Sequence, residues 1–112
     1  MLGYDEFAKR VEWFTRSGQE SEDFQLGEGT ATLRYVKNGD PEYRAAIAGM
    51  FGFDEVYEEY PGDFILFYID GKLQGIGTYS PDRGAAWVVD EVDDMVKTFR
   101  ACYLAFIHAS EE

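Results

Sequence analysis

The chain has 112 residues, enough for one folded domain and too few for two of ordinary size. Hydrophobic residues make up 46% of it and aromatic residues 17%, so its composition excludes an intrinsically disordered protein. Twenty-two Asp and Glu against ten Lys and Arg give a formal net charge of −12. Nucleic acid and anionic membranes are therefore poor partners, whereas basic protein surfaces are favourable ones.

A single cysteine, Cys102, allows no internal disulfide, and the N-terminus lacks the basic start and apolar stretch of a signal peptide. The longest dense apolar run, Phe64 to Ile69, falls far short of the roughly 20 residues that a membrane span needs. We therefore expect a cytoplasmic protein with one domain, residues 1–112.

Apolar residues near the N-terminus recur at spacings of three and four, at Tyr4, Phe7, Ala8, Val11 and Phe14. This pattern predicts a helix that ends at Ser17-Gly18. The following stretch, residues 19–28, holds four acids and no base around Phe24 and Leu26. It suits either a loop or one short acidic helix.

Residues Thr30 to Val36 alternate strand-forming residues with others and predict a strand. Asn38-Gly39 then predicts a turn. Asp40-Pro41-Glu42 has the order of an N-cap, a proline at the first helical position and an acid in the first turn, so a short helix is expected to about Phe51. An acidic edge strand is expected over Glu55 to Tyr60.

The clearest hairpin pattern runs from Phe64 to Ile69, through Asp70-Gly71, and on from Lys72 to Tyr79. Asp-Gly supplies the positive φ angles of a tight primed turn. The first of these strands is apolar on both faces, which favours a central strand covered on two sides.

Towards the C-terminus, Pro81 to Gly84 predicts a turn and Ala85 to Val89 a further strand. A stripe of apolar residues from Val92 to Ile107 predicts the longest helix, with the acids of Asp90 to Asp94 at its N-cap and first turn. The expected fold class is α+β: an antiparallel sheet of four to five strands flanked by N-terminal and C-terminal helices.

Few residues in the chain suit catalysis. The one histidine, His108, falls at the end of the last helix, where an imidazolium complements the helix dipole. Cys102 lies on the apolar stripe and fits a buried small side chain. Gly75-Ile76-Gly77 sits inside a strand, where glycines mark a bend or a close backbone approach rather than a phosphate loop. We expect no enzymatic activity and no cofactor.

Clustered carboxylates are the main candidate functional feature. Glu20, Glu22, Asp23 and Glu28 repel one another without supporting an obvious helix, which favours selection for a basic partner. The acids of the chain match no calcium-loop spacing, so no metal site is expected. Acids spaced along one face imitate DNA phosphates and can occupy a DNA-binding cleft.

The hairpin carries a family resemblance. The pattern consists of Phe64-Ile-Leu-Phe-Tyr, a short turn, Leu73-x-x-Ile76-Gly77, a short apolar strand and a helix ending at Tyr103-Leu104. This pattern resembles that of the staphylococcal-type uracil-DNA glycosylase inhibitors, which are small acidic DNA mimics of about this length. The resemblance covers roughly residues 60 to 104, and the spacing differs by about one residue at the turn. The N-terminal half is similar only in kind.

The resemblance implies a mechanism. In that family, acids after the first helix engage the DNA-binding groove of the enzyme, and an apolar pocket between sheet and helix traps the leucine that the enzyme pushes into the minor groove. The acids here are Glu20, Glu22, Asp23 and Glu28. The implied pocket residues are Phe24, Leu26, Ile65, Phe67, Ile76 and Trp87. Ala85-Ala86 stands where a family member has a methionine, so the contact from that position is lost or passes to Trp87.

Two other functions remain open from the sequence. The first is an immunity protein, antitoxin, or anti-restriction or anti-CRISPR protein that binds a basic nuclease or effector, for which the same charge suffices without a leucine pocket. The second is a domain that binds a small ligand or a metal. We expect the chain to inhibit uracil-DNA glycosylase. For each apolar candidate, ordinary packing in the core is the alternative role.

Overall fold

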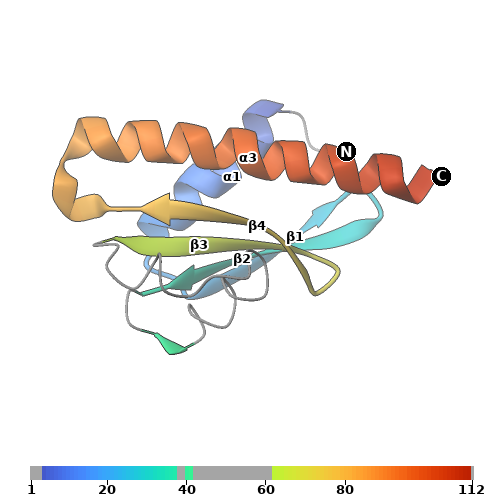
Figure 1. The fold of residues 1–112 in the computed structure, drawn as a ribbon, viewed down its shortest axis with the longest axis horizontal. Coiled ribbons are helices and arrows are strands. Elements are labelled where there is room, and N and C mark those ends of the chain that lie inside the picture. The colour runs from blue at the N-terminus through green and yellow to red at the C-terminus, as the bar shows by residue number, and fades with distance from the viewer. Residues whose placement is uncertain (1–3, 38–39, 42–61, 112) are drawn as a thin grey trace.

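The computed structural model describes residues 4–37, 40–41 and 62–111 (Figure 1). The elements in chain order are α1 (Tyr4–Ser17), β1 (Ser21–Leu26), β2 (Gly29–Val36), β3 (Asp63–Ile69), β4 (Lys72–Tyr79), the 3-10 helix η2 (Pro81–Arg83) and α3 (Ala85–Glu111). The strands form one antiparallel sheet in the order β1-β2-β3-β4, and both helices cover the same face of it. This arrangement confirms the predicted α+β class.

The hairpin of β3 and β4 matches its prediction. Asp70 and Gly71 form the turn with φ angles of 50° and 80°, as a primed turn requires. The carboxylate of Asp70 also accepts a hydrogen bond from the Thr30 backbone N–H at 2.9 Å, and the Asp70 N–H donates to the Thr30 carbonyl at 2.9 Å. The turn is thereby fastened to the start of β2.

Strand β3 is central, as predicted, because it pairs with both β2 and β4. Its side chains alternate between two apolar clusters. Ile65, Phe67 and Ile69 pack beneath the helices, while Phe64 and Leu66 lie on the opposite face. All five are fully buried, so the strand serves as the core of the sheet.

Two glycines of β4 let α3 approach the sheet closely. A Cβ atom built on Gly77 would lie 2.5 Å from Cγ of Met95, and one built on Gly75 would lie 3.1 Å from the ring of Phe99. Real Cβ atoms essentially never lie as close as 2.5 Å to another side chain, so a side chain at Gly77 would force Met95 to move, whereas at Gly75 the Phe99 ring would have to shift by a few tenths of an ångström. The predicted close approach at these glycines is confirmed, with α3 as the element that approaches.

The prediction of a loop or short helix for residues 19–28 is wrong, because Ser21–Leu26 is strand β1. Phe24 and Leu26 are buried, while Ser21, Asp23 and Gln25 are exposed, so the segment has the alternation of a half-buried strand. Gly27, with a φ of 63°, opens the tight turn into β2. Charged side chains are common on edge strands, so the acids are compatible with this position.

The predicted strand over Ala85 to Val89 is also wrong, because α3 begins at Ala85. The Val88 N–H donates to the Gly84 carbonyl at 3.1 Å, and Val88 and Val92 continue the inward-facing stripe by one more turn. The acids of Asp90 to Asp94 therefore lie in the second and third turns rather than at the helix start. Within the described part of the chain, no helix has both the length and the apolar character to cross a bilayer.

Three other predicted elements fall outside the described residues: the turn at Asn38-Gly39, the helix that runs to about Phe51, and the edge strand over Glu55 to Tyr60.

Candidate functional site

Glu22 and Asp23 lie on β1, at the edge of the described sheet, and Glu20 and Glu28 flank the strand. β1 pairs with β2, where the Tyr35 N–H donates to the Glu20 carbonyl at 2.8 Å. Because hydrogen-bonded and non-hydrogen-bonded pairs alternate in an antiparallel ladder, the backbone groups of Ser21, Asp23 and Gln25 point to the open side of the strand. All three residues are exposed, so this edge is accessible.

Three of the four acidic candidates face solvent. Glu20 and Glu28 are exposed, at the two ends of β1. Asp23, between them, is exposed and accepts a hydrogen bond from the Thr32 hydroxyl at 2.8 Å. The described residues of β1 include no basic side chain, although Glu20 shares its cleft with Arg16, Arg34 and Lys37. We call Glu20, Asp23 and Glu28 the acidic edge.

Glu22 differs from the other three. Its side chain is only 17% exposed, and its Oε1 lies 3.6 Å from the Arg10 guanidinium of α1. Its Oε2 is buried and has no hydrogen-bond partner among the described residues. Glu22 thus joins α1 to β1 by an ion pair, and the Arg10 guanidinium offsets its negative charge.

A groove of about 520 Å³ runs between α1 and β1. Its described lining consists of Glu6, Lys9, Arg10, Trp13 and Glu22. Trp13 is 52% exposed, and the Arg10 guanidinium lies 5.7 Å from the centre of the Phe24 ring. The groove offers an aromatic surface beside the acidic edge. Trp13 is not among the candidates predicted from the sequence, although a large apolar residue off the buried stripe of α1 indicates an exposed contact surface.

The six apolar candidates do not line one pocket. Phe24, Leu26, Ile65 and Phe67 are at most 6% exposed and belong to the core beneath the helices. Ile76 packs against the cluster on the other face of the sheet. Trp87 lies on α3, 47% exposed, with the Arg83 guanidinium 4.6 Å from its ring centre.

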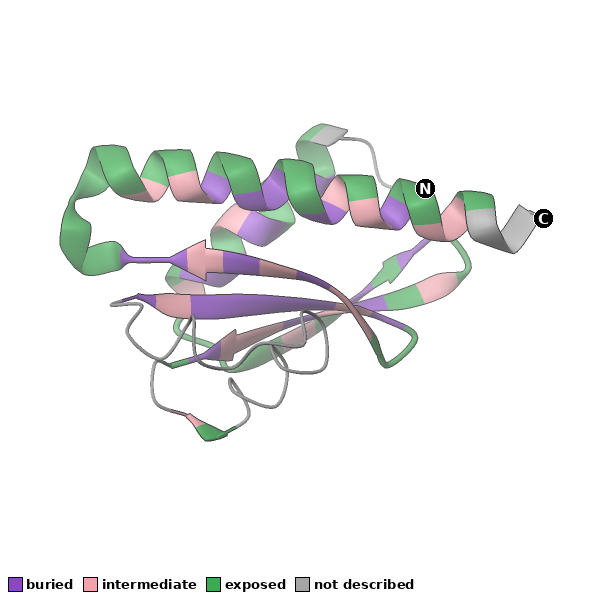
Figure 2. Ribbon diagram, in the orientation of Figure 1, coloured by how far each residue is buried: buried purple, intermediate pink, exposed green. Residues whose placement is uncertain are grey.

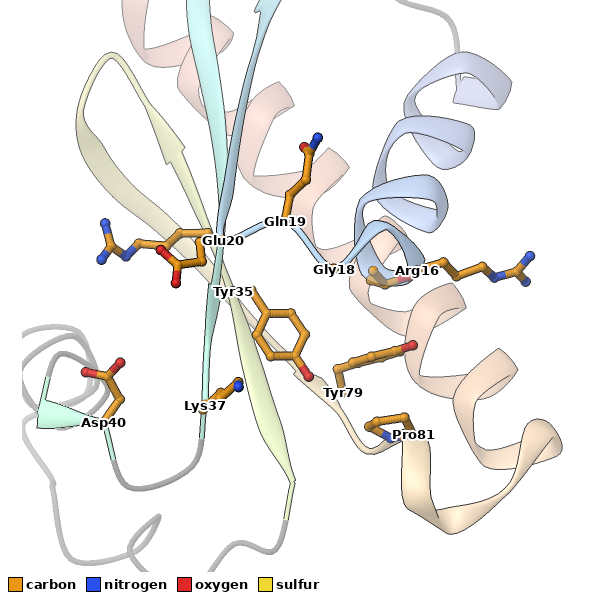
Figure 3. A pocket seen from close by; sticks show the side chains of 11 residues that line it. Arg16, Gly18, Gln19, Glu20, Tyr35, Lys37, Asp40, Tyr79 and Pro81 are labelled. Carbon is orange, nitrogen blue, oxygen red and sulfur yellow. The ribbon is translucent and has the colours of Figure 1, made fainter.

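A larger cleft of about 740 Å³ lies where α1 ends and β2 and β4 terminate (Figure 3). Tyr35 and Tyr79 form its aromatic wall, edge to face, with ring centres 6.0 Å apart. Glu20 lines it as well, so this cleft begins at the N-terminal end of β1. The remaining described lining residues are Thr15, Arg16, Gly18, Gln19, Arg34, Lys37, Asp40 and Pro81.

The Tyr35 hydroxyl in this cleft donates a hydrogen bond to the Asp63 carboxylate. Burial, followed by the hydrogen bond and negative charge of Asp63, raises the pKa of Tyr35 well above its usual range. The phenol therefore keeps its proton at neutral pH and acts as a donor rather than as a base or nucleophile.

The other reactive group of interest, Cys102, is half-buried, and burial raises the pKa of its thiol. A protonated thiol is a poor nucleophile and a poor metal ligand. Among the described residues, no three His, Cys, Asp or Glu side chains are placed to hold a metal ion together. Neither Tyr35 nor Cys102 is activated for covalent chemistry.

The raised pKa of Tyr35 predicts that the free energy of unfolding falls at alkaline pH. In the unfolded chain Tyr35 ionises near the usual pKa of about 10, whereas in the folded protein it retains its proton. The contribution of the protonated phenol to the free energy of unfolding is therefore complete below pH ~10 and declines as the pH rises further. Between about pH 9.5 and 11, Tyr35→Phe should lose less free energy of unfolding than the wild type. Urea titrations at each pH measure this difference. Equal declines in the two proteins would contradict the raised pKa.

Glu20 lines the larger cleft, and Glu22 lines the smaller groove and pairs with Arg10 of α1. The site is thus an acidic strand with an aromatic groove on its flank, a geometry suited to contact with a macromolecule. Comparisons with family models, curated proteins and solved structures find no match to this chain.

Proposed function

We propose that this chain is a DNA-mimic inhibitor of uracil-DNA glycosylase that presents its acidic edge to the DNA-binding cleft of the enzyme. The observation that carries the proposal is the row of exposed carboxylates, without a base on the strand, along an accessible sheet edge. The net charge of −12 steers such a surface towards a basic cleft and raises the association rate.

The geometry of a strand supports the mimicry. A strand rises about 3.4 Å per residue, which equals the axial rise per nucleotide in one strand of duplex DNA. Glu20 and Asp23 are three residues apart, so their Cα atoms are separated by about 10 Å and their side chains point to opposite faces of the sheet, which places negative charge on both sides of this edge. Because β1 is held in a ladder with β2, the spacing of these charges is fixed before binding.

The groove with Trp13 offers an exposed apolar surface beside Glu22 of β1. The apolar residues suggested by sequence are in the core or elsewhere on the molecule, so the minor-groove leucine of the enzyme requires another contact. The exposed indole of Trp13 beside Glu22 is the contact we assign to it. Such an aromatic anchor within a charged rim is the usual source of affinity in an interface.

A second candidate is an inhibitor of another basic nuclease or effector protein. It is favoured by one observation: the six apolar candidates do not converge on a leucine pocket. A partner bound through charge alone needs no such pocket.

The salt dependence of binding tests the role of charge. We expect the Kd for uracil-DNA glycosylase, measured by calorimetry, to rise roughly tenfold or more between about 50 and 200 mM salt, because ions screen the exposed carboxylates. A Kd that does not change with salt would contradict the acidic edge as the binding surface. Binding to a basic nuclease but not to the glycosylase would establish the second candidate instead.

A further inference from the structure

Helix α3 carries a regular exposed stripe. The stripe residues follow alternating spacings of three and four, and every one of them is exposed. They are Trp87, Asp90, Asp94, Lys97, Ala101, Leu104 and His108. Figure 2 shows exposed residues along the outer side of α3 over most of its length. Spacings of three and four are those of the a and d positions of a heptad repeat.

The stripe lies opposite the face of α3 that packs on the sheet. Val92, Phe99 and Phe106 occupy the heptad position farthest from the stripe, and all three contribute to the core. Of the four large apolar side chains that are exposed in the described part of the chain, Trp87, Val89 and Leu104 lie on α3. The helix therefore presents apolar groups to solvent, although the Arg83 guanidinium lies 4.6 Å from the centre of the Trp87 ring.

We propose that the stripe of α3 pairs antiparallel with the same stripe of a second copy of this chain. With the two-fold axis beside the helix between Met95 and Val96, Trp87 of each copy faces Leu104 of the other. Asp90 then faces Ala101, and Asp94 faces Lys97. Each pair joins an a position to a d position, which is the register of an antiparallel coiled coil, and the contact is isologous.

The charges along the stripe favour a second copy of this chain as the partner and favour the antiparallel orientation. The acids of the stripe lie in its N-terminal half, and Lys97 and His108 lie in its C-terminal half. An antiparallel partner therefore places Asp94 against Lys97, whereas a parallel partner places Asp90 against Asp90 and Asp94 against Asp94. The stripe from Trp87 to Leu104 is about 26 Å long at 1.5 Å per residue, and the acidic edge on β1 lies outside this contact.

Sedimentation velocity over a range of protein concentrations tests the proposal through charge reversal. We expect the wild type to dimerise reversibly and Asp94→Lys or Lys97→Asp alone to raise the dimer Kd at least tenfold, because each places like charges across the axis. An equimolar mixture of the two variants should recover the dimer, since one copy then supplies two lysines and the other two aspartates. Lys37→Asp, a charge reversal at an exposed position after the end of β2, is the matched control.

The mixture separates pairing between copies from pairing within one helix. Asp94 and Lys97 are also three residues apart on one helix, and mixing cannot restore a contact inside each variant. Circular dichroism confirms that each variant is folded. A wild type that stays monomeric at about millimolar concentration, reversals without effect, or a mixture that does not associate would overturn the proposal. A monomer that still inhibits the glycosylase would leave the proposed function intact.

Discussion

Replacement of Phe99 by alanine is expected to lower the free energy of unfolding by about 3–5 kcal/mol. Phe99 is fully buried, and its ring stacks on Phe67 with centres 4.9 Å apart and planes 14° from parallel. It also fills the space above Gly75 and Gly77, which have no side chains to close a cavity. Because β4 and α3 meet at this ring, the surrounding structure has little freedom to collapse into the void.

Urea unfolding at neutral pH measures this loss. Val89→Ala is the control: Val89 lies on the same helix but is 53% exposed, so its truncation should change stability by only about 0.5 kcal/mol or less. A loss below about 1 kcal/mol for Phe99→Ala would show that α3 does not pack on β4 as described.

Removal of the charges of the acidic edge should raise the concentration needed for half-inhibition of uracil-DNA glycosylase about 10- to 100-fold. The variant combines Glu20→Gln, Asp23→Asn and Glu28→Gln, which keep the size of each side chain. All three residues are exposed, and Asn at position 23 retains an acceptor for the Thr32 hydroxyl. Stability should therefore change little. Glu22 is left in place because its ion pair with Arg10 has a structural role.

A variant with the same net charge serves as the control. It combines three neutralising changes at exposed positions away from β1, namely Asp5→Asn, Asp82→Asn and Asp93→Asn. If the location of the charges matters, this control should inhibit nearly as well as the wild type. Equal losses in the two variants would mean that net charge alone, and not the acidic edge, governs the interaction.

Much of the fold is predictable from short-range patterns. Helix α1 is indicated by its apolar stripe, and strand β3 by a run that is apolar on both faces. The end of β3 is indicated by the turn residues Asp70-Gly71. The glycines of β4 likewise indicated a close approach. Each of these features depends on residues next to one another in the chain.

The parts that were wrong depend on contacts across the fold. β1 has the composition of an acidic loop, and it becomes a strand because β2 supplies its ladder and α1 covers Phe24. The first turn of α3 contains β-branched and small residues that also suit a strand, and its packing against the core decides the outcome. Three of the four acidic candidates are exposed on or beside β1, whereas Glu22 pairs with Arg10. Four of the six apolar candidates lie together in the core, while Ile76 lies on the other face of the sheet and Trp87 on α3.

The most direct test of the proposed function is a uracil-excision assay. The purified chain is titrated into uracil-DNA glycosylase acting on a uracil-containing oligonucleotide, with an unrelated acidic protein in parallel. We expect excision to fall in proportion to added protein and to stop near one copy per enzyme, because the acidic edge and DNA compete for the same cleft. Unchanged excision at large molar excess would contradict the inhibitor function.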